Sequence, residues 1–358
     1  MINGRDKSEF MNEKYLELRN YLLSSTNEER NGKVSEMTEE QINDFYKIYH
    51  LTFEELGDKK YREGNYIEAS LNYECEVKLL EMVQLFEFLH DPNEEIIQSK
   101  WEELQDARLR LLLAEYHKAA VNWEKQETPD DFVTEVLKHG FWTCWGNNKD
   151  VDVLVTGINP SFDPKFPYEP LPTFAGTHES TVWHHFYPSF SECRGRHWNP
   201  ILKIVANQFR VNQPHEEKAA YLDLFPLRVS KQTDMDKIPV ELRANLLRVT
   251  QMEIEYLRPR LIVHLNKSSW FYWGIDREHP WMGYGLEKIE NYTGKGELYR
   301  ICGMQNTDSK ILPLTKTNLE GALLLLYKSQ TPGGILLPEK ELLTEEDIRE
   351  IFRKYYKP

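Results

Sequence analysis

An asparagine that follows a short buried strand is the residue of this chain best placed to do chemistry. The aliphatic run 151–155 predicts a strand, and Gly157-Ile-Asn-Pro-Ser161 turns the chain sharply at its carboxyl end. Open α/β sheets bind their ligands at that end of their strands. Asn159 presents a polar side chain there, Gly157 permits close backbone approach, and Pro160 fixes the direction in which the chain leaves. The same residues also fit an ordinary strand-to-loop turn, because Asn-Pro is a common turn dipeptide.

Other residue types that catalyse reactions or hold cofactors lack a convincing spacing. His184 and His185 are adjacent and would point to opposite sides of a strand, and no third ligand is suitably spaced, so no metal site is predicted. The four cysteines lie far apart, which predicts reduced and mostly buried thiols rather than a disulfide framework. The chain has no phosphate-binding glycine loop and no dinucleotide fingerprint, and we expect no cofactor.

Charge is distributed unevenly along the 358 residues, whose net charge is −14. Residues 1–150 carry 18 Lys and Arg against 32 Asp and Glu, residues 151–330 carry 21 against 20, and residues 331–358 carry 5 against 6. The acidity, which would repel a nucleic acid, is therefore concentrated in the amino-terminal part. Four cations of the neutral part are candidates for a basic face, or for an ordinary solvated helix surface: Arg194, Arg196, Lys203 and Arg210.

The amino-terminal part, residues 1–128, has the pattern of an acidic helical region. Apolar residues recur there at three- and four-residue spacings. Helices are expected over Glu9–Leu23, Glu39–Leu56, Tyr66–Leu89 and Glu94–Val121. Thr38 and Gln41 form a possible capping box, and Gly64 and Ala69 resemble the turn between two helices of a tetratricopeptide repeat, although no second copy follows. Such a bundle could bind a partner, form a lid or serve as a scaffold.

Residues 129–330 alternate between strand and helix patterns, which is typical of an α/β fold with a mostly parallel central sheet flanked by helices. Strands are expected at Val151–Val155, Tyr221–Phe225, Arg260–Leu265, Leu298–Ile301 and Lys310–Leu314. Helices are expected over Asp130–Lys138, Asn199–Gln208, Val240–Tyr256 and Leu319–Tyr327, with Ser268 as the cap of another. Residues 331–358 are expected to form a helical tail. No apolar run approaches the about 20 residues of a membrane span, and no signal-peptide core begins the chain, so we expect a cytoplasmic protein without a membrane partner.

Four segments of the second part, taken in order, resemble the uracil-DNA glycosylase superfamily in its mismatch-specific and single-strand-selective branches. The segments are Gly157–Ser161, Arg196–Val205, Tyr221–Arg228 and Leu257–Leu265. They cover the region from about residue 130 to residue 330 and leave the amino-terminal helices outside the match. The resemblance implies a uracil-DNA-glycosylase-like fold and a monofunctional DNA glycosylase.

A monofunctional glycosylase flips a nucleotide out of the stack and lets water attack the sugar carbon as the base departs. The resemblance implies that Asn159 positions this water through hydrogen bonds. The groups that it places around the base are Gly157, Ile158, Ser161 and Phe162, with Phe186 or Phe190 stacked on it unless these rings are core contacts. Arg194 and Arg196, from the candidate basic face, would contact the DNA phosphates.

One departure from the family concerns the residue that reads the base. Where many members carry an asparagine that contacts the uracil edge, this chain has Asp223. An ionised carboxylate only accepts hydrogen bonds, so it suits an exocyclic amine, as on cytosine or a modified cytosine, better than the carbonyl of uracil. Asp223 could instead cap a helix, or the alignment could be displaced. His264 could reach the base pocket or be a satisfied core histidine.

A second departure concerns the last motif, where the family has His-Pro-Ser or Asn-Pro-Ser. The nearest equivalent is Leu314–Gly321, in which Asn318 could contact the departing base and Lys316 a phosphate. His279-Pro280 ranks second because it follows the third strand too closely. If no residue stabilises the departing base, the protein could bind a base without excising it.

The sequence therefore predicts a DNA glycosylase-like hydrolase that cleaves the N-glycosidic bond of a flipped uracil or modified base. Its partner would be single- or double-stranded DNA, and its role base-excision repair or phage defence. The alternative is a non-catalytic module that recognises a damaged or single-stranded base and recruits a protein through the amino-terminal helices. A third reading is a structural adaptor with a degenerate site, which would have no pocket beside Asn159.

Overall fold

The computed structural model divides the chain into two compact units, one of residues 1–118 and one of the described residues from 119 onward. The boundary falls about ten residues before the polar segment at which the change of sequence pattern suggests one. The structure describes residues 4–46, 51–90, 94–124, 130–141, 149–160, 204–205, 218–275, 281–307, 311, 314–327 and 338–357. None of the described helices is long and apolar enough to cross a bilayer.

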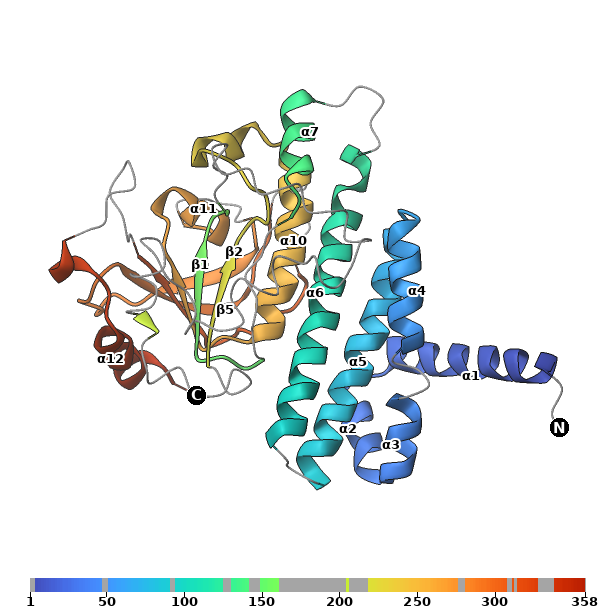
Figure 1. Cartoon of the computed structure of the whole chain (residues 1–358). Helices are drawn as coiled ribbons and strands as arrows, with labels where there is room; N and C mark the ends of the chain where they lie inside the picture. Colours follow the sequence, from blue (N-terminus) through green and yellow to red (C-terminus); the bar gives the residue numbers. More distant parts are fainter. Residues whose placement is uncertain are drawn as a thin grey trace. The chain divides into compact units, whose positions relative to one another are not determined.

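The first unit is helical throughout its described residues. Its helices are α1 (Gly4–Ser24), α2 (Asn27–Glu36), α3 (Glu39–Phe45), α4 (Leu51–Arg62), α5 (Tyr66–His90) and α6 (Glu94–Glu124), the last of which continues past the unit boundary (Figure 1). Helix α2 was not expected, because only Val34 among its ten residues is a large apolar side chain. The expected helix over Glu39–Leu56 overlaps α3 and the first half of α4, and residues 47–50 lie outside the described part. The capping box of Thr38 and Gln41 at the start of α3 is confirmed.

Helices α4 and α5 form the expected hairpin, and a glycine lies at its turn. Gly64 has a φ of +69°, a conformation that residues with a Cβ rarely adopt. Ala69 is completely buried, and the Tyr73 ring packs so closely on Gly57 that a Cβ there would overlap it. Small residues thus let the two helices approach each other closely.

Ionisable side chains are buried between α4, α5 and α6. Arg110 forms ion pairs with Glu76 at 2.5 Å and with Glu54 at 3.5 Å, and the Tyr73 hydroxyl donates a hydrogen bond of 2.7 Å to Asp58. Burial, reinforced by the nearby Glu54 and Asp58 carboxylates and opposed by Arg110, raises the pKa of Glu76 to about 7. Three carboxyl groups thus lie around one buried guanidinium.

The second unit is built on a mostly parallel sheet, as the alternation of patterns predicts. Within the described residues the sheet has six strands in the order β2-β1-β3-β6-β5-β4. The parallel strands are β1 (Val153–Gly157), β2 (Ala219–Asp223), β3 (Leu261–His264) and β6 (Leu323–Leu326), and β5 (Glu297–Met304) and β4 (Tyr284–Lys288) run antiparallel at one side. The chain is therefore an α/β protein with a mixed sheet, preceded by a helical region.

One expected helix is a central strand. The prediction of a helix over Leu319–Tyr327 is wrong, because Leu323–Leu326 forms β6, with Leu323 opposite Leu261 and Leu325 opposite Val263. Every residue of β6 is buried, as in a strand covered on both faces. A short apolar run of this kind has no periodicity that distinguishes a strand from a helix. Of the strand expected at Lys310–Leu314, only Ile311 and Leu314 belong to the described residues, and neither lies in a strand.

Helices cover both faces of the sheet (Figure 1). Val153, Val155 and the alternate residues of the neighbouring strands pack with Ile348 and Ile351 of α12 (Glu345–Tyr355). The other face belongs to α10 (Val240–Leu257), which was expected, and to α11 (Trp270–Trp273). Helix α7 (Asp131–Lys138), with Asp130 as its N-cap, matches the expected helix over Asp130–Lys138. The helix expected over Asn199–Gln208 lies almost wholly outside the described residues.

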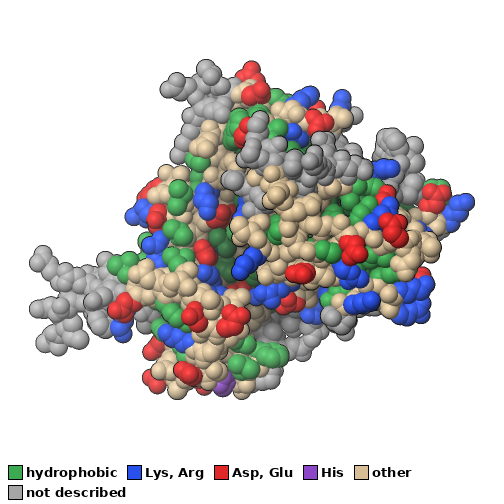
Figure 2. All heavy atoms as spheres, turned by 180° about the vertical axis from the view of Figure 1, so that it is seen from behind, with side chains coloured by type: hydrophobic (Ala, Val, Ile, Leu, Met, Phe, Trp, Pro, Cys, Tyr) green, Lys and Arg blue, Asp and Glu red, His purple; other side chains and the backbone are tan. Residues whose placement is uncertain are grey.

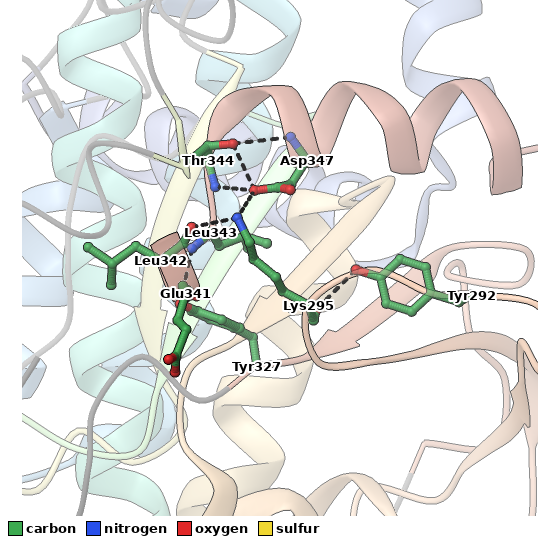
Figure 3. Close-up of polar contacts among 8 residues, drawn as sticks. All are labelled: Tyr292, Lys295, Tyr327, Glu341, Leu342, Leu343, Thr344 and Asp347. Atoms are coloured by element: carbon green, nitrogen blue, oxygen red, sulfur yellow. Dashed lines mark hydrogen bonds and ion pairs between the residues drawn. The ribbon is translucent and has the colours of Figure 1, made fainter. Parts of the chain in front are cut away.

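A polar cluster attaches α12 to the sheet (Figure 3). Lys295, in the turn between β4 and β5, donates hydrogen bonds of 2.8 Å to the Leu342 carbonyl and to the Asp347 carboxylate. Asp347 also accepts from the backbone N–H of Thr344, which caps α12. The hydroxyl of Tyr327, directly after β6, donates to the Glu341 carbonyl at 2.9 Å. The segment that leads into α12 is thereby joined to two strand ends, so residues 338–357 pack as part of the second unit.

Candidate functional site at the carboxyl edge of the sheet

The order of the parallel strands indicates where a ligand is expected. From β1 the chain passes to β2 on one side, and from β2 it returns to β3 on the other side of β1. In open α/β sheets ligands usually bind where the strand order reverses in this way, which here is beyond the carboxyl ends of β1 and β3. Gly157, Ile158 and Asn159 leave β1 at this edge. Backbone hydrogen bonds from Leu224 to Gly157 and from Phe225 to Ile158 hold this segment beside the end of β2.

A carboxyl group, a phenol and a glycine meet at this edge. Gly157 lies opposite Asp223 in the register of β1 and β2, and the Tyr221 hydroxyl donates a hydrogen bond of 3.0 Å to Oδ1 of Asp223. A Cβ on Gly157 would overlap Oδ1 of Asp223 and would stand 2.6 Å from the Tyr221 hydroxyl oxygen. Glycine is therefore required for the two polar side chains to lie against β1.

Asp223 is poised to exchange a proton near neutral pH. The residue as a whole is partly exposed at the strand end, yet the surrounding protein strongly desolvates its carboxyl group. This desolvation raises the pKa of Asp223 to about 7, against the lowering effect of the Tyr221 hydrogen bond. Carboxyl groups with pKa values displaced in this way are enriched at functional sites. At neutral pH both the donor and the acceptor form of this group are populated.

Asn159 follows β1 at the same edge and is half-buried. Its side-chain Nδ2 donates a hydrogen bond of 2.8 Å to the Pro160 carbonyl. This bond restricts the rotation of the amide, and the Oδ1 atom of an amide can accept a hydrogen bond from a water molecule. The arrangement can orient a water or a polar ligand, but an amide does not act as a strong base.

His264 lies on the other face of the sheet from Asp223. It is opposite Thr156 in the register of β1 and β3, and successive side chains of a strand point to opposite faces. Its Nδ1 is 2.8 Å from the Thr156 hydroxyl and its Nε2 is 2.7 Å from the Ser269 hydroxyl. Because Ser269 donates its proton to the Asn266 carbonyl, Nε2 of His264 is the donor and Nδ1 the acceptor. Burial lowers the pKa of His264 to about 3, so the ring is neutral.

The neutral His264 ring is hydrogen-bonded at both nitrogens. Of the two alternatives for His264, a residue of the base pocket or a core histidine with its hydrogen bonds satisfied, the structure has the second. The His264 ring also explains the start of α11, where a cap from Ser268 was expected. Ser269 precedes the helix and makes no capping hydrogen bond with its side chain. Its hydroxyl is bonded to His264 and to Asn266 instead.

Asn318 and Lys316 lie at the opposite edge of the sheet from Asn159. They precede β6, whose first residue Leu323 donates a backbone hydrogen bond to Arg260, at the start of β3. The backbone N–H of Asn318 is bonded to the buried Glu255 carboxylate at 2.6 Å. The expectation that Asn318 joins Asn159 in one site depended on a helix after residue 318, and the strand found there separates the two residues.

The remaining candidates belong to segments that the structure does not describe. They are Ser161, Phe162, Phe186, Phe190, Arg194 and Arg196, together with His184, His185, His279 and Pro280.

On the face presented in Figure 2, the described acidic and basic side chains are intermixed. Among the described residues, no group of three or more His, Cys, Asp or Glu side chains could hold a metal ion. Of the cysteines within the described ranges, Cys75 is buried and Cys302 is exposed.

Tyr221 is the member of the site that was not recognised in the sequence. Its signal is the alternation of strand residues, which puts positions 221 and 223 on one face of β2.

Comparison of the chain with protein-family models, with curated proteins and with solved structures finds no match. The resemblance to uracil-DNA glycosylases therefore rests on the sequence motifs alone, and the function has to be argued from the geometry of this edge.

Proposed function

We propose that the second unit is a uracil-DNA-glycosylase-like hydrolase that binds a flipped base beyond the carboxyl ends of β1 and β3 and cleaves its N-glycosidic bond. The observation that carries the proposal is that Asn159 follows β1 at the same edge of the sheet at which β2 ends with Asp223, whose pKa is raised to about 7. Such a site provides one group that can hold water and another that can contact a base. The role would be base-excision repair or attack on modified bases of phage DNA.

The chemistry requires few residues. The transition state of glycosidic cleavage resembles an oxocarbenium ion, so an enzyme chiefly positions the water and stabilises charge on the departing base. In the proposed complex, Asn159 holds the water in line with the bond that breaks. Gly157 lets the Tyr221 hydroxyl and the Asp223 carboxyl lie against β1, and Asp223 contacts the edge of the base. The water supplies a hydroxyl to the sugar carbon and, overall, a proton to the released base.

A non-catalytic recognition module is the second candidate, and the position of Asn318 favours it. The residues expected to contact the departing base and a phosphate, Asn318 and Lys316, are at the amino edge of the parallel strands. Of the residues that the sequence analysis assigns to contact with the base, Asp223 is then the described one at the carboxyl edge that could contact the departing base. A protein of this kind would bind a flipped base and leave its glycosidic bond intact.

Base excision by the full chain tests the proposal. Oligonucleotides carrying one uracil, hypoxanthine or modified cytosine would be incubated with the protein and cleaved with alkali at abasic sites. We expect cleavage by the wild type and a loss of about 100-fold or more in Asn159→Ala, because the water is no longer positioned. Asn318→Ala is the matched control, because it removes the same amide at the opposite edge, and it should retain wild-type activity. Binding without cleavage of any substrate would select the recognition module.

A further inference from the structure

The hydrogen bond between Tyr221 and Asp223 makes the two oxygens of the carboxyl group unequal. Oδ1 accepts the Tyr221 proton and lies against Gly157. The Tyr221 ring is buried in the core on this face of the sheet, so its hydroxyl has a fixed position. Within the described ranges, Tyr221 is the hydrogen-bonding partner that Asp223 has. Oδ2 is therefore the oxygen that is left to contact a ligand.

We propose that Tyr221 and Asp223 form a two-state reader of the base, in which the ionised carboxylate selects an exocyclic amine and the protonated acid selects a ring carbonyl. This inference rests on the proposed function, because it concerns the same site at the carboxyl edge of the sheet. An amine, as on cytosine or adenine, donates a hydrogen bond to the ionised Oδ2. A carbonyl, as on uracil or hypoxanthine, accepts a hydrogen bond from the protonated Oδ2. Tyr221 is a positioning residue, since it acts through Asp223.

The surroundings of Asp223 allow both protonation states. Strand β1 contributes Val155 and Gly157 on this face, neither of which titrates, and Ile204 and Val205 are apolar members of the same core. The titratable neighbour among the described residues is Tyr221, whose hydrogen bond favours the ionised carboxylate. Because desolvation raises the pKa of Asp223 to about 7, protonation prevails in mild acid and ionisation in mild base. The preferred base edge therefore changes across neutral pH.

Binding measurements separate this inference from the hydrolase proposal. The full chain with Asn159→Ala, which prevents turnover, would be titrated with single-stranded oligonucleotides of abasic spacers that carry one cytosine or one uracil. Fluorescence anisotropy gives the two dissociation constants in mild acid and in mild base. Their ratio removes the general effect of pH on DNA binding. We expect the ratio to change by about tenfold in favour of cytosine as the pH rises, which corresponds to one charge-assisted hydrogen bond.

Two further substitutions test the mechanism of reading. In Asp223→Asn the Tyr221 hydroxyl still donates to Oδ1, so Nδ2 is a donor at every pH, and uracil should be preferred throughout. Tyr221→Phe removes the hydrogen bond that favours the ionised form, so the pH of equal preference should rise by about one unit. Thermal unfolding confirms that both variants are folded.

Each outcome bears on one proposal or both. A cytosine-to-uracil ratio that is independent of pH in the Asn159→Ala chain overturns the reader and leaves the hydrolase intact. A pH dependence that persists in Asp223→Asn also overturns the reader. Binding with the expected pH dependence, combined with no excision by the wild type, supports the reader and overturns the hydrolase. Absence of binding to either oligonucleotide overturns both.

Discussion

Two carboxyl groups in different units have pKa values raised to about 7 and differ in what surrounds them. Glu76 is fully buried among helices and lies 2.5 Å from Arg110, with other carboxylates nearby. Asp223 is partly exposed at a strand end and is bonded to an uncharged phenol. Desolvation is the largest cause of the shift in both. A raised pKa thus marks a candidate site only where a ligand can reach the group, which distinguishes Asp223 from Glu76.

The largest effect should come from removing the cation beside Glu76. Arg110→Met leaves a buried carboxylate without its partner, and we expect the free energy of unfolding to fall by about 3–5 kcal/mol at pH 8. The loss should be smaller at pH 5, where Glu76 takes up a proton. Urea unfolding followed by circular dichroism measures both values. Lys60→Met, which removes the exposed pair with Glu63, is the control and should change stability by less than about 1 kcal/mol. An equal loss of stability in Arg110→Met and Lys60→Met would contradict the role of Arg110 as the partner of a buried carboxylate.

A methyl group at the carboxyl edge should have the next largest effect. In Gly157→Ala the new Cβ displaces the Asp223 carboxyl and the Tyr221 hydroxyl, so we expect a loss of about 1–3 kcal/mol and weaker base binding. Gly32→Ala in α2 meets no atom within 4 Å and should stabilise the protein by about 0.5–1 kcal/mol. Calorimetry and the anisotropy titration compare the two variants. Unchanged binding in Gly157→Ala would show that the ligand lies elsewhere.

Neutralising the two carboxyls separately sharpens the comparison between them. A group whose pKa is raised by folding stabilises the native state in acid, and this contribution is lost as the pH rises through the folded value. For Asp223 the window runs from about 4 to about 7, and the change is on the order of 4 kcal/mol. Asp223→Asn and Glu76→Gln should each flatten stability across this range. Only Asp223→Asn should alter the preference between bases. A similar change of preference in Glu76→Gln would show that Asp223 does not differ from Glu76 in contacting the ligand.

The smallest effect is expected where α12 is attached to the sheet. Lys295→Met removes two hydrogen bonds around a half-exposed ammonium group. We expect a loss of about 0.5–1 kcal/mol in the free energy of unfolding, because solvent screens this pair. Hydrogen exchange of the α12 amides should accelerate while that of β1 stays slow. Acceleration in both elements would mean that α12 and the sheet unfold as one.

The fold was predictable where local pattern and tertiary environment agree. The short aliphatic runs of β1 and β3, rich in β-branched residues, are typical of buried strands, and the 18 residues of α10 have apolar residues at helical spacing. Strand β6 was not predictable, because four consecutive leucines fit a buried helix as well as a strand, and only pairing with β3 decides between them. Strand β4 was missed because Glu287 and Lys288 make it polar.

The site was predictable to a similar extent. Asn159 could be located because it follows a recognisable strand and Asp223 because it belongs to one, and the sheet brings these strand ends together. Tyr221 was missed because its role depends on a contact two residues along the same strand. The position of Asn318 relative to the site follows from the direction of β6, and that of His264 from the face of the sheet on which its side chain lies. Neither the strand direction nor the sheet face can be inferred from the residue types.

The strand order has a consequence for how the protein is made. Strand β6 lies between β3 and β5, yet both neighbours precede it in the chain. A ribosome therefore releases β3, β4 and β5 before the strand that joins them, while the helices of residues 1–118 emerge first and have local partners. Since domains tend to fold in order of synthesis, the helical unit should fold early. The sheet cannot be completed until β6 has left the exit tunnel, and until then the edges of β3 and β5 that pair with β6 remain open.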